Sequence, residues 1–414
     1  MNVDDLLRDT LREQAAEQPP AGPGFADWVL AVRRRRRNRR LVTGVAAAVV
    51  AVVVAVGVPM LNSGKDDVRP SGVVDPDTTS AHPDQSPPRA LIAAGQTALA
   101  AYYIPTTVKK SATESVSERT YWLFDRKSGT YVKAPKWSFV AFAPGMKTAA
   151  VLERTLPASR IGLLDLATRE VKRWIPVSHK VGGLSFSADG RKLVATTYTY
   201  NPDAEFHPAD PNSNVGEPLR PAVRSGFYVL DVASGKGSWG AVDVGDGQRA
   251  DGRNGQINNR QDFALTRDGR YVWGGVPSDD IGKLFYDFTG AEVPGPVDRE
   301  RYLVWSIEAG LSPNGKLVAG EFAGVTWHTS SYVIDSATGK KTEVHGQEPL
   351  AWADDKSFIA WDIGKGDNGA GKSEFHQRLV LVTIGSDKEE PLSGFLGGST
   401  DVSAGRWRPV FATR

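Results

Sequence analysis

The sequence predicts an all-β fold, a β-propeller, behind a single amino-terminal transmembrane helix. Three observations predict it. An arginine cluster is followed at once by an uncharged apolar stretch, two turn motifs alternate along most of the remaining chain, and several strands between these turns are apolar on both faces. Together they divide the 414 residues into four segments: 1–40, 41–61, 62–96 and 97–414.

The first segment predicts short amphipathic helices followed by a basic cluster. Val3, Leu6, Leu7 and Leu11 recur at helical spacing, and Pro19–Pro20 ends the pattern. Helices this short are marginal alone in water, so they need a surface. We expect residues 1–32 either to bind a cytoplasmic partner or to lie on the inner leaflet.

Residues 41–61, LVTGVAAAVVAVVVAVGVPML, carry no charge. As a helix they would be about 31 Å long, close to the roughly 30 Å hydrocarbon thickness of a bilayer. Valine is common here, but a lone segment in lipid must pair its backbone groups internally and is therefore helical. The sequence predicts a retained single-pass anchor. A cleaved signal peptide and a twin-arginine export signal are the alternatives.

The arginine cluster, Arg33 to Arg40 around Asn38, sets the orientation of the chain. Positive charge on the amino side places residues 1–40 in the cytoplasm and the rest outside. The cluster is expected to contact anionic membrane lipid. Beyond residue 40 the chain is nearly neutral, because 1–40 hold nine arginines against six acidic residues and the whole chain carries +2. Nucleic-acid binding needs a concentrated basic face, so none is predicted.

Residues 62–96 are predicted to be a linker. The stretch from Asn62 to about Arg89 is rich in Pro, Asp and Ser and poor in large apolar residues, which is typical of an extended tether.

Two turn motifs repeat six times each beyond the linker. One is a strand, a tight turn and a strand, clearest at residues 181–198, 264–275 and 309–322 and weaker at 139–152, 350–361 and 402–411. The other is an apolar run, an aspartate and a glycine turn, beginning at Tyr121, Ile161, Phe227, Lys283, Ser331 and Leu379. Because the two motifs alternate, each repeat is predicted to be four short strands.

The recurring aspartates have a mechanical reason to be there. An Asp or Ser side chain accepts hydrogen bonds from backbone N–H groups two residues on, and Gly or Asn then takes the positive φ of a tight hairpin. We therefore interpret these residues as turn formers rather than catalysts: Asp165, Asp189, Asp231, Asp268, Asp287, Asn314 and Asp335.

Strands such as LLDL at 163–166 and LVLV at 379–382 are apolar on both faces, which predicts sheets covered on both sides, as in blades stacked around an axis. The alternation over residues 97–414 resembles the WD40-like repeats of Tol-type β-propellers. The whole layout resembles membrane-anchored propeller proteins of high-GC Gram-positive bacteria. The repeat count predicts six blades, or seven if Ala98 begins a further one, with the final unit completing the first blade.

No catalytic or metal-binding motif is apparent. The six histidines, at 82, 179, 207, 328, 345 and 376, lack ligand spacing, and there is no cysteine. GAGKS near residue 369 lacks the spacing of a phosphate loop. Most tryptophans are expected to fill space between blades. The sequence therefore assigns no catalytic, cofactor or metal residue and leaves the ligand-binding residues unknown.

Three insertions are the candidate recognition surfaces: residues 201–224, 244–261 and 365–375. Binding loops commonly project from a rigid scaffold. The second holds oxygen-bearing side chains that would suit Ca²⁺, although they miss the EF-hand pattern: Asp246, Asp251, Asn254, Asn258 and Asn259.

The favoured function is a non-enzymatic, extracytoplasmic binding or sensing module on the cell membrane, with an unidentified protein or cell-envelope ligand on the propeller. One alternative is an anti-sigma-like regulator that signals through residues 1–32. The other is a calcium-dependent hydrolase similar to propeller lactonases, with ligands that converge from separate blades.

Overall fold

Antiparallel strands make up nearly all the regular structure of the described residues, together with one 3-10 helix, η1 (Arg299–Tyr302). The computed structural model describes residues 78–206, 224–242, 260–275, 283–296, 299–304, 306–324, 329–363, 375–386, 388–397 and 405–414. These residues all lie in one of the two units into which the chain divides, residues 69–414. The all-β class predicted for this part of the chain is confirmed.

The first sheet joins the two ends of the repeat region. Its last strand, from the carboxyl terminus, pairs antiparallel with β2 from Thr97↔Thr413 to Tyr103↔Arg408, which confirms the predicted closure. β2 and β3 form a long hairpin, and β4 pairs with β3 on its other side. The six strands are β1 (Ala93–Ala94), β2 (Thr97–Lys109), β3 (Glu114–Asp125), β4 (Thr130–Ala134), β10 (Ala204–Phe206) and β24 (Arg408–Thr413).

The second sheet has seven strands in the order β12-β11-β9-β8-β7-β6-β5. Its central strand, β8, is 16 residues long and pairs with β7 through its first half and with β9 through its second. The strands are β5 (Trp137–Phe142), β6 (Thr148–Glu153), β7 (Ala158–Asp165), β8 (Val171–Phe186), β9 (Lys192–Tyr198), β11 (Arg224–Asp231) and β12 (Gly237–Ala241).

Three smaller sheets follow in chain order. The first contains β13 (Ala264–Leu265), β14 (Val272–Gly275), β15 (Lys283–Tyr286) and β16 (Glu292–Val293). The next contains β17 (Leu317–Phe322), β18 (Ser330–Asp335) and β19 (Lys341–His345). The last contains β20 (Gln347–Trp352), β21 (Ser357–Asp362), β22 (Arg378–Thr383) and β23 (Glu389–Pro391).

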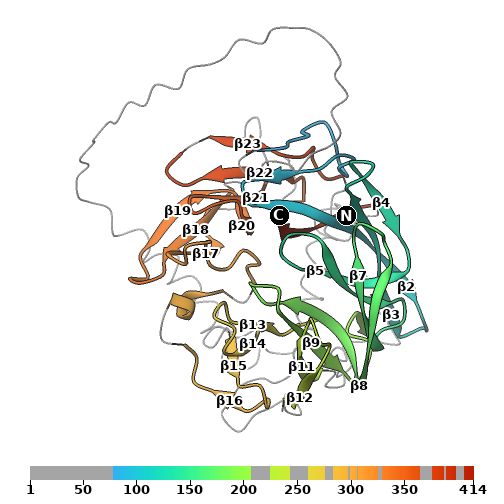
Figure 1. Ribbon diagram of the computed structural model, residues 1–414. Helices are drawn as coiled ribbons and strands as arrows, with labels where there is room; N and C mark the ends of the chain where they lie inside the picture. Colours follow the sequence, from blue (N-terminus) through green and yellow to red (C-terminus); the bar gives the residue numbers. More distant parts are fainter. Residues whose placement is uncertain are drawn as a thin grey trace, which may run out of the picture. The chain divides into compact units, whose positions relative to one another are not determined.

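Apolar side chains join each sheet to a neighbour, so the sheets lie around a centre in a propeller-like arrangement (Figure 1). Four clusters of buried side chains each draw on two sheets. One pair of residues from each cluster shows the two sheets that it joins: Leu123 with Val151, Val194 with Val272, Val333 with Val380, and Leu99 with Leu379. This confirms the expectation of two covered faces for the first, second and last sheets, each of which packs against two neighbours.

Tight turns at one end of the sheets contact one another in a closed cycle, and we call this end the turn face. Each contact joins the turn of one repeat to that of the next, and the chain ends complete the cycle. The contacts are Gln96 N to Ala353 O, Asn314 N to Asp355 Oδ1, Arg267 to Ser312 O, Lys192 Nζ to Gly269 O, Gly190 beside Pro144, Gly145 N to Thr413 O, and Arg414 N to Gln96 O.

The predicted turn chemistry is confirmed at the motif residues. Ser187 Oγ donates to Asp189 Oδ1 at 2.6 Å and accepts from Lys192 N at 2.9 Å, while Gly190 takes a φ of 70°. In the other motif, Asp231 Oδ1 accepts from Ser234 N at 2.7 Å. The same local bonds recur at Asp165, Asp268, Asp287, Asn314 and Asp335.

The number of sheets differs from the six blades predicted and from the alternative of seven. Hydrogen bonds join the described strands into five sheets. The reason lies in β8, because this uninterrupted strand connects two repeats that the sequence motifs separate.

The predicted linker, residues 62–96, differs from an extended tether over its described part. From Thr78 onward it lies against the sheets: Ser80 N donates to Ala93 O at 2.7 Å, and His82 N donates to Leu392 O at 2.9 Å. Ser86 Oγ accepts a hydrogen bond from Trp407 Nε1 at 3.0 Å. The many prolines and polar residues hide this docking, which combines backbone hydrogen bonds with the burial of a few apolar side chains, Ile92 and Ala94 among them.

Residues 1–40 and the predicted span at 41–61 lie outside the described residues. Within the described ranges, no helix has the length and apolar character needed to cross a membrane.

Candidate functional site

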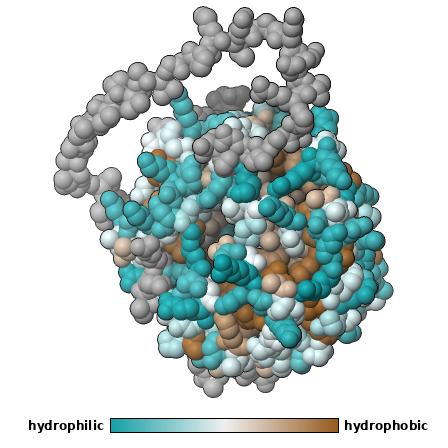
Figure 2. Space-filling model, viewed as in Figure 1, coloured by the Kyte–Doolittle hydropathy of each residue, from teal (hydrophilic) through white to brown (hydrophobic). Residues whose placement is uncertain are grey.

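The longest connections emerge opposite the turn face, and we call that end of the sheets the loop face. Because neighbouring strands are antiparallel, the β2–β3, β6–β7 and β9–β11 connections all emerge there. All three predicted insertions begin and end on this face. Their described parts are residues 201–206 and 224 of the first, 260–261 of the second, and 375 of the third. Figure 2 shows hydrophilic side chains over much of the one side of the molecule in view, with apolar groups between them.

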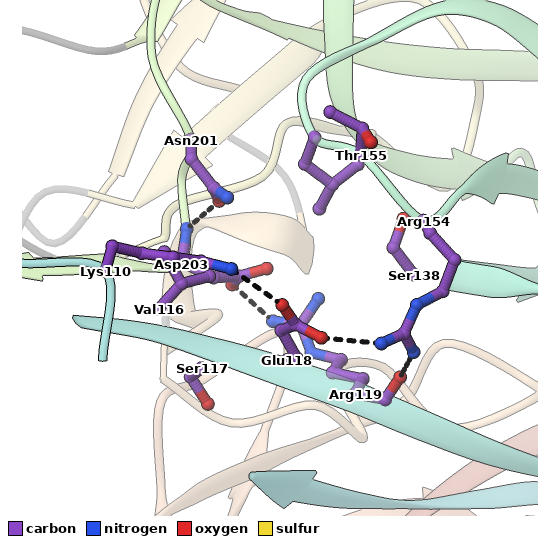
Figure 3. A pocket seen from close by; sticks show the side chains of 11 residues that line it. Lys110, Val116, Ser117, Glu118, Arg119, Ser138, Arg154, Thr155, Asn201 and Asp203 are labelled. Atoms are coloured by element: carbon purple, nitrogen blue, oxygen red, sulfur yellow. Dashed lines mark hydrogen bonds and ion pairs between the residues drawn. The ribbon is translucent and has the colours of Figure 1, made fainter. Parts of the chain in front are cut away.

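A pocket of about 180 Å³ opens on the loop face (Figure 3). Four chain segments form it: the β2–β3 hairpin, the start of β5, the β6–β7 connection and the start of the first insertion. Its lining residues are Lys110, Val116, Ser117, Glu118, Arg119, Ser138, Arg154, Thr155, Leu156, Asn201 and Asp203.

The first insertion is held against the β2–β3 hairpin by backbone pairing. Its short strand β10 pairs antiparallel with β3, with Ala204 opposite Val116. Ser117 N donates to Asp203 O at 2.9 Å. Asn201 Oδ1 accepts from Asp203 N at 3.0 Å, the local bond that turns the chain into β10. The first insertion, which belongs to the third repeat, thus forms a wall of the pocket together with the hairpin of the first repeat.

Glu118 forms the outer rim of the pocket, between two cations. Its Oε1 lies 3.0 Å from Lys110 Nζ and its Oε2 lies 2.5 Å from Arg154 Nη2. Arg154 Nη1 also donates to Arg119 O at 3.3 Å. The Lys110 and Arg154 side chains are each 44% exposed, so both ends of this rim remain open to water.

Asp203 forms the inner wall, between two arginines. Arg260 binds it through two parallel bonds, Nε to Oδ1 and Nη2 to Oδ2, both 2.8 Å. Arg119 Nη2 binds the same Oδ1 at 2.7 Å. Both guanidinium groups also lie near the ring of Phe139, 5.5 Å away for Arg119 and 4.9 Å for Arg260. The Asp203 side chain is only 7% exposed, so these charges are largely removed from water.

A second carboxylate completes this cluster behind the pocket. Arg260 Nη1 donates to Asp262 Oδ2 at 3.1 Å, and Tyr198 OH donates to Asp262 Oδ1 at 2.7 Å. A Cβ on Gly183 would lie 1.9 Å from Asp262 Oδ1, so only glycine leaves room for the carboxylate there. We call Arg119, Tyr198, Asp203, Arg260 and Asp262 the charge cluster.

Burial and charge act in opposite directions on the cluster. Burial raises the pKa of Asp203, but the charges of Arg260 and Arg119 outweigh it and hold that pKa below its usual range. Burial lowers the pKa of Arg260, yet Asp262 and Asp203 raise it well above the ordinary value. Burial, with the charge of Asp262, raises the pKa of Tyr198. At neutral pH, Asp203 and Arg260 are charged and Tyr198 is protonated.

The third insertion is held by another buried arginine. Arg406 is 2% exposed; its Nη1 donates to Phe375 O and its Nη2 to Gln377 Oε1, both at 2.5 Å. Phe375 is the last residue of that insertion, and Arg406 precedes the closing strand β24. Buried arginines therefore fix described ends of all three insertions, since Arg260 and Asp203 join the first two.

Several sequence candidates lie apart from the pocket. His179 stacks on Trp239 with ring centroids 3.6 Å apart, and His376 stacks on Phe395 at 4.2 Å. The suggested calcium ligands between 246 and 259, together with His207 and His328, lie outside the described residues. Within the described ranges, no group of three or more His, Cys, Asp or Glu is placed to hold a metal ion. Of the eight tryptophans among the described residues, four are buried, Trp137, Trp352, Trp361 and Trp407, and four are partly buried, Trp122, Trp174, Trp239 and Trp273.

The insertion pattern identified Asp203 and Arg260 only as parts of loops, and it missed Lys110, Glu118 and Arg154. One sequence signal does point to the hairpin. The stretches 97–109 and 114–125 are longer than the corresponding strands of other repeats, and charged residues alternate with small polar ones near its tip. Their meeting with Asp203, 84 residues away from Arg119, depends on the ring arrangement of the sheets.

No protein-family model matches the sequence, and no curated protein matches it. Many solved structures are similar in fold. Hydrazine synthase of Kuenenia stuttgartiensis has 10% identity and a TM-score of 0.34, with 66% of this chain and 74% of that chain covered.

Two further structures have comparable scores. TolB of Acinetobacter baumannii has 13% identity and a TM-score of 0.36 over 70% of this chain, and the acylaminoacyl peptidase of Pyrococcus horikoshii has 14% and 0.36 over 72%. The aligned region spans 65% of the TolB chain and 46% of the peptidase chain.

Proposed function

We propose that this chain is a single-pass membrane protein that displays a six-bladed propeller outside the cell as a binding or sensing module. The loop face is its recognition surface, and the partner is a protein or another cell-envelope component. The observation that carries this proposal is the location of the three insertions, whose described ends all lie on the loop face and are fixed by buried arginines.

Pairing within the seven-stranded sheet supports the six-bladed description. If β8 is divided where its partner changes from β7 to β9, the sheet becomes two four-stranded blades. Five turns and the junction of the chain ends then give one contact point per blade on the turn face. The anchor rests on the sequence alone, on the charge-free stretch 41–61 behind the arginine cluster.

A rigid body with short turns at one end and long loops at the other is suited to recognition through the loops. The turn face is less suited to recognition, because its polar side chains are engaged in local turn bonds. The loop face has both the insertions and the pocket.

Site-specific photo-crosslinking in intact cells tests this proposal. A photoreactive residue replaces either Thr155, on the loop face before β7, or Ala167, on the turn face after β7. Both positions are exposed. We expect a discrete higher-mass adduct from position 155 and none from 167, with the partner identified by mass spectrometry. Equal adducts at both positions, or none at 155, would contradict recognition through the loop face.

A further inference from the structure

The hydrogen-bond acceptors of the loop-face pocket are already engaged. Both oxygens of Glu118 accept from cations, one from Lys110 and one from Arg154. Both oxygens of Asp203 accept from arginines, and Asn201 Oδ1 accepts from a backbone N–H. A ligand that offers mainly donors would therefore have to share these oxygens with the cations and the N–H group that already bind them.

Donors, in contrast, are left over around the same pocket. Lys110 Nζ uses one of its three N–H groups, and Arg154 Nε makes no hydrogen bond within the described residues. Arg119 Nη1 is enclosed and has no hydrogen-bond partner among them. The side-chain N–H₂ of Asn201 and the hydroxyl of Thr155 add further donors at the wall (Figure 3). The pocket is thus complementary to a ligand rich in acceptors.

The charge of the lining points the same way. Three cations, Lys110, Arg119 and Arg154, face two carboxylates, Glu118 and Asp203. Behind the wall, Arg260 and Asp262 offset each other. One positive charge remains in excess, and attraction to an anion is stronger beside partly buried groups than in bulk water. A single negative charge would balance the site.

The volume limits the size of such a ligand. About 180 Å³ corresponds to roughly six water molecules at ~30 Å³ each. We propose that the pocket binds a small carboxylate-bearing molecule no larger than one sugar ring. Its carboxylate lies beside the remaining N–H groups of Lys110 and Arg154, next to Glu118, and its hydroxyl groups face Thr155 and Asn201. This goes beyond the proposed interaction role and requires no protein partner, because residues of this chain line the pocket.

Calorimetric titration of the full-length protein in detergent tests the ligand class. The probes are glucuronate, which carries one carboxylate, glucose, which is its neutral counterpart, and glucose 6-phosphate. We expect saturable binding of glucuronate at least about tenfold tighter than that of glucose, since a charge-assisted bond is worth more than this factor. Absence of glucuronate binding, equal affinity for glucose, or tighter binding of the phosphate would overturn the proposal.

Substitutions at the rim separate ligand binding from a structural role. Arg154→Gln should weaken glucuronate binding about tenfold by removing one charge-assisted bond. Glu118→Gln should tighten it severalfold, because the variant frees Lys110 and Arg154 and adds one net positive charge. If the rim residues served only folding, Glu118→Gln would not increase the affinity for glucuronate.

Arg160→Gln is the matched control. Arg160 forms an exposed pair with Glu153 at 2.7 Å and is 47% exposed, similar to Arg154, yet it does not line the pocket. Glucuronate affinity should be unchanged in this variant. Equal weakening by Arg154→Gln and Arg160→Gln, or weakening by Glu118→Gln, would overturn the assignment of the rim.

Discussion

Arg260 binds Asp203 through two parallel 2.8 Å hydrogen bonds. This contact joins the end of the second insertion to the beginning of the first, 57 residues earlier in the chain. Arg119, from the β2–β3 hairpin, shares the same carboxylate at 2.7 Å. Three distant segments of the loop face therefore meet at one buried anion. The geometry of the pocket wall depends on this carboxylate, because it is the only anion that contacts both guanidinium groups among the described residues.

Asp203→Asn should strongly destabilise the fold. The change leaves two largely buried arginines with an uncharged partner, and breaking a buried ion pair from one side costs about 3–5 kcal/mol. Denaturant unfolding of the full-length protein measures the loss. The control is Glu170→Gln, which disrupts a Glu170–Lys172 pair that is 71% and 52% exposed and should change stability by less than about 0.5 kcal/mol. Similar losses in both variants would contradict the role of the charge cluster.

The stability difference between wild type and Asp203→Asn has a defined pH dependence. The arginines hold the pKa of Asp203 below its usual range, so its ionised form is stabilised by folding. This contribution is fully present above the unfolded pKa of about 4 and is lost as the pH falls through the lower folded pKa. The stability difference between wild type and Asp203→Asn should therefore be constant from pH 5 to 7 and shrink below pH 4. A difference that grows on acidification would contradict this assignment.

Removal of residues 405–414 should unfold or aggregate the repeat region rather than trim a tail. The truncation deletes β24 and Trp407, which is 1% exposed, and leaves one edge of β2 unpaired. Limited proteolysis should show rapid cleavage throughout residues 78–404. A chain extended by ten Gly and Ser residues after Arg414 keeps β24 and is expected to resist like wild type. Equal resistance of the truncated chain would show that closure is dispensable.

Lys283 should make stability rise with pH above neutrality. Burial lowers its pKa to about 7, against the opposing charge of Glu300. Its Nζ lies 3.8 Å from the centroid of the Trp273 ring, a contact that also favours the charged form. Between pH 7 and about 10.4 the unfolded chain keeps a proton that the folded chain has lost, so unfolding becomes less favourable as pH rises.

The comparison for this effect is Lys283→Met, which keeps the apolar part of the side chain. Wild type should gain about 1–2 kcal/mol relative to this variant between pH 7 and 9, after allowance for partial exposure. Lys172→Met, at an exposed position, should give no such change. Parallel pH curves for wild type and Lys283→Met in denaturant unfolding would contradict the lowered pKa.

The repeat motifs predicted the strands well because turn chemistry is local. Asp231 and Gly235, for example, fix their turn through bonds within five residues, so the motif is visible in the sequence. Closure by β24 was also predictable, since the repeat region begins with the aspartate motif and ends with the other turn motif, so that its last strand can complete the first sheet. The continuous strand β8 was not, because no turn residue marks the place where its partner changes.

The pocket was less predictable than the fold for a physical reason. Arg119 and Asp203 are ordinary charged residues in the sequence, and only the ring of sheets brings them to 2.7 Å. The docking of residues 78–92 was missed because it depends on backbone bonds such as that from Gly394 N to Gln85 O, which leave no pattern in side chains.

Labelling of single introduced cysteines in intact cells tests the central claim, that the propeller is displayed outside with its loop face in use. The natural chain has no cysteine, so each label reports one position. Ala112→Cys and Lys127→Cys place exposed thiols near opposite ends of β3, on the loop face and turn face respectively, and Gln18→Cys reports the amino-terminal segment.

With a membrane-impermeant maleimide, we expect rapid labelling at 127, slower labelling at 112, and none at 18 until the cells are lysed. The purified protein should react equally fast at 112 and 127, because no partner then covers the loop face. Labelling at 18 with protection at 127 would contradict the orientation, and equal rates at 112 and 127 in cells would contradict recognition through the loop face.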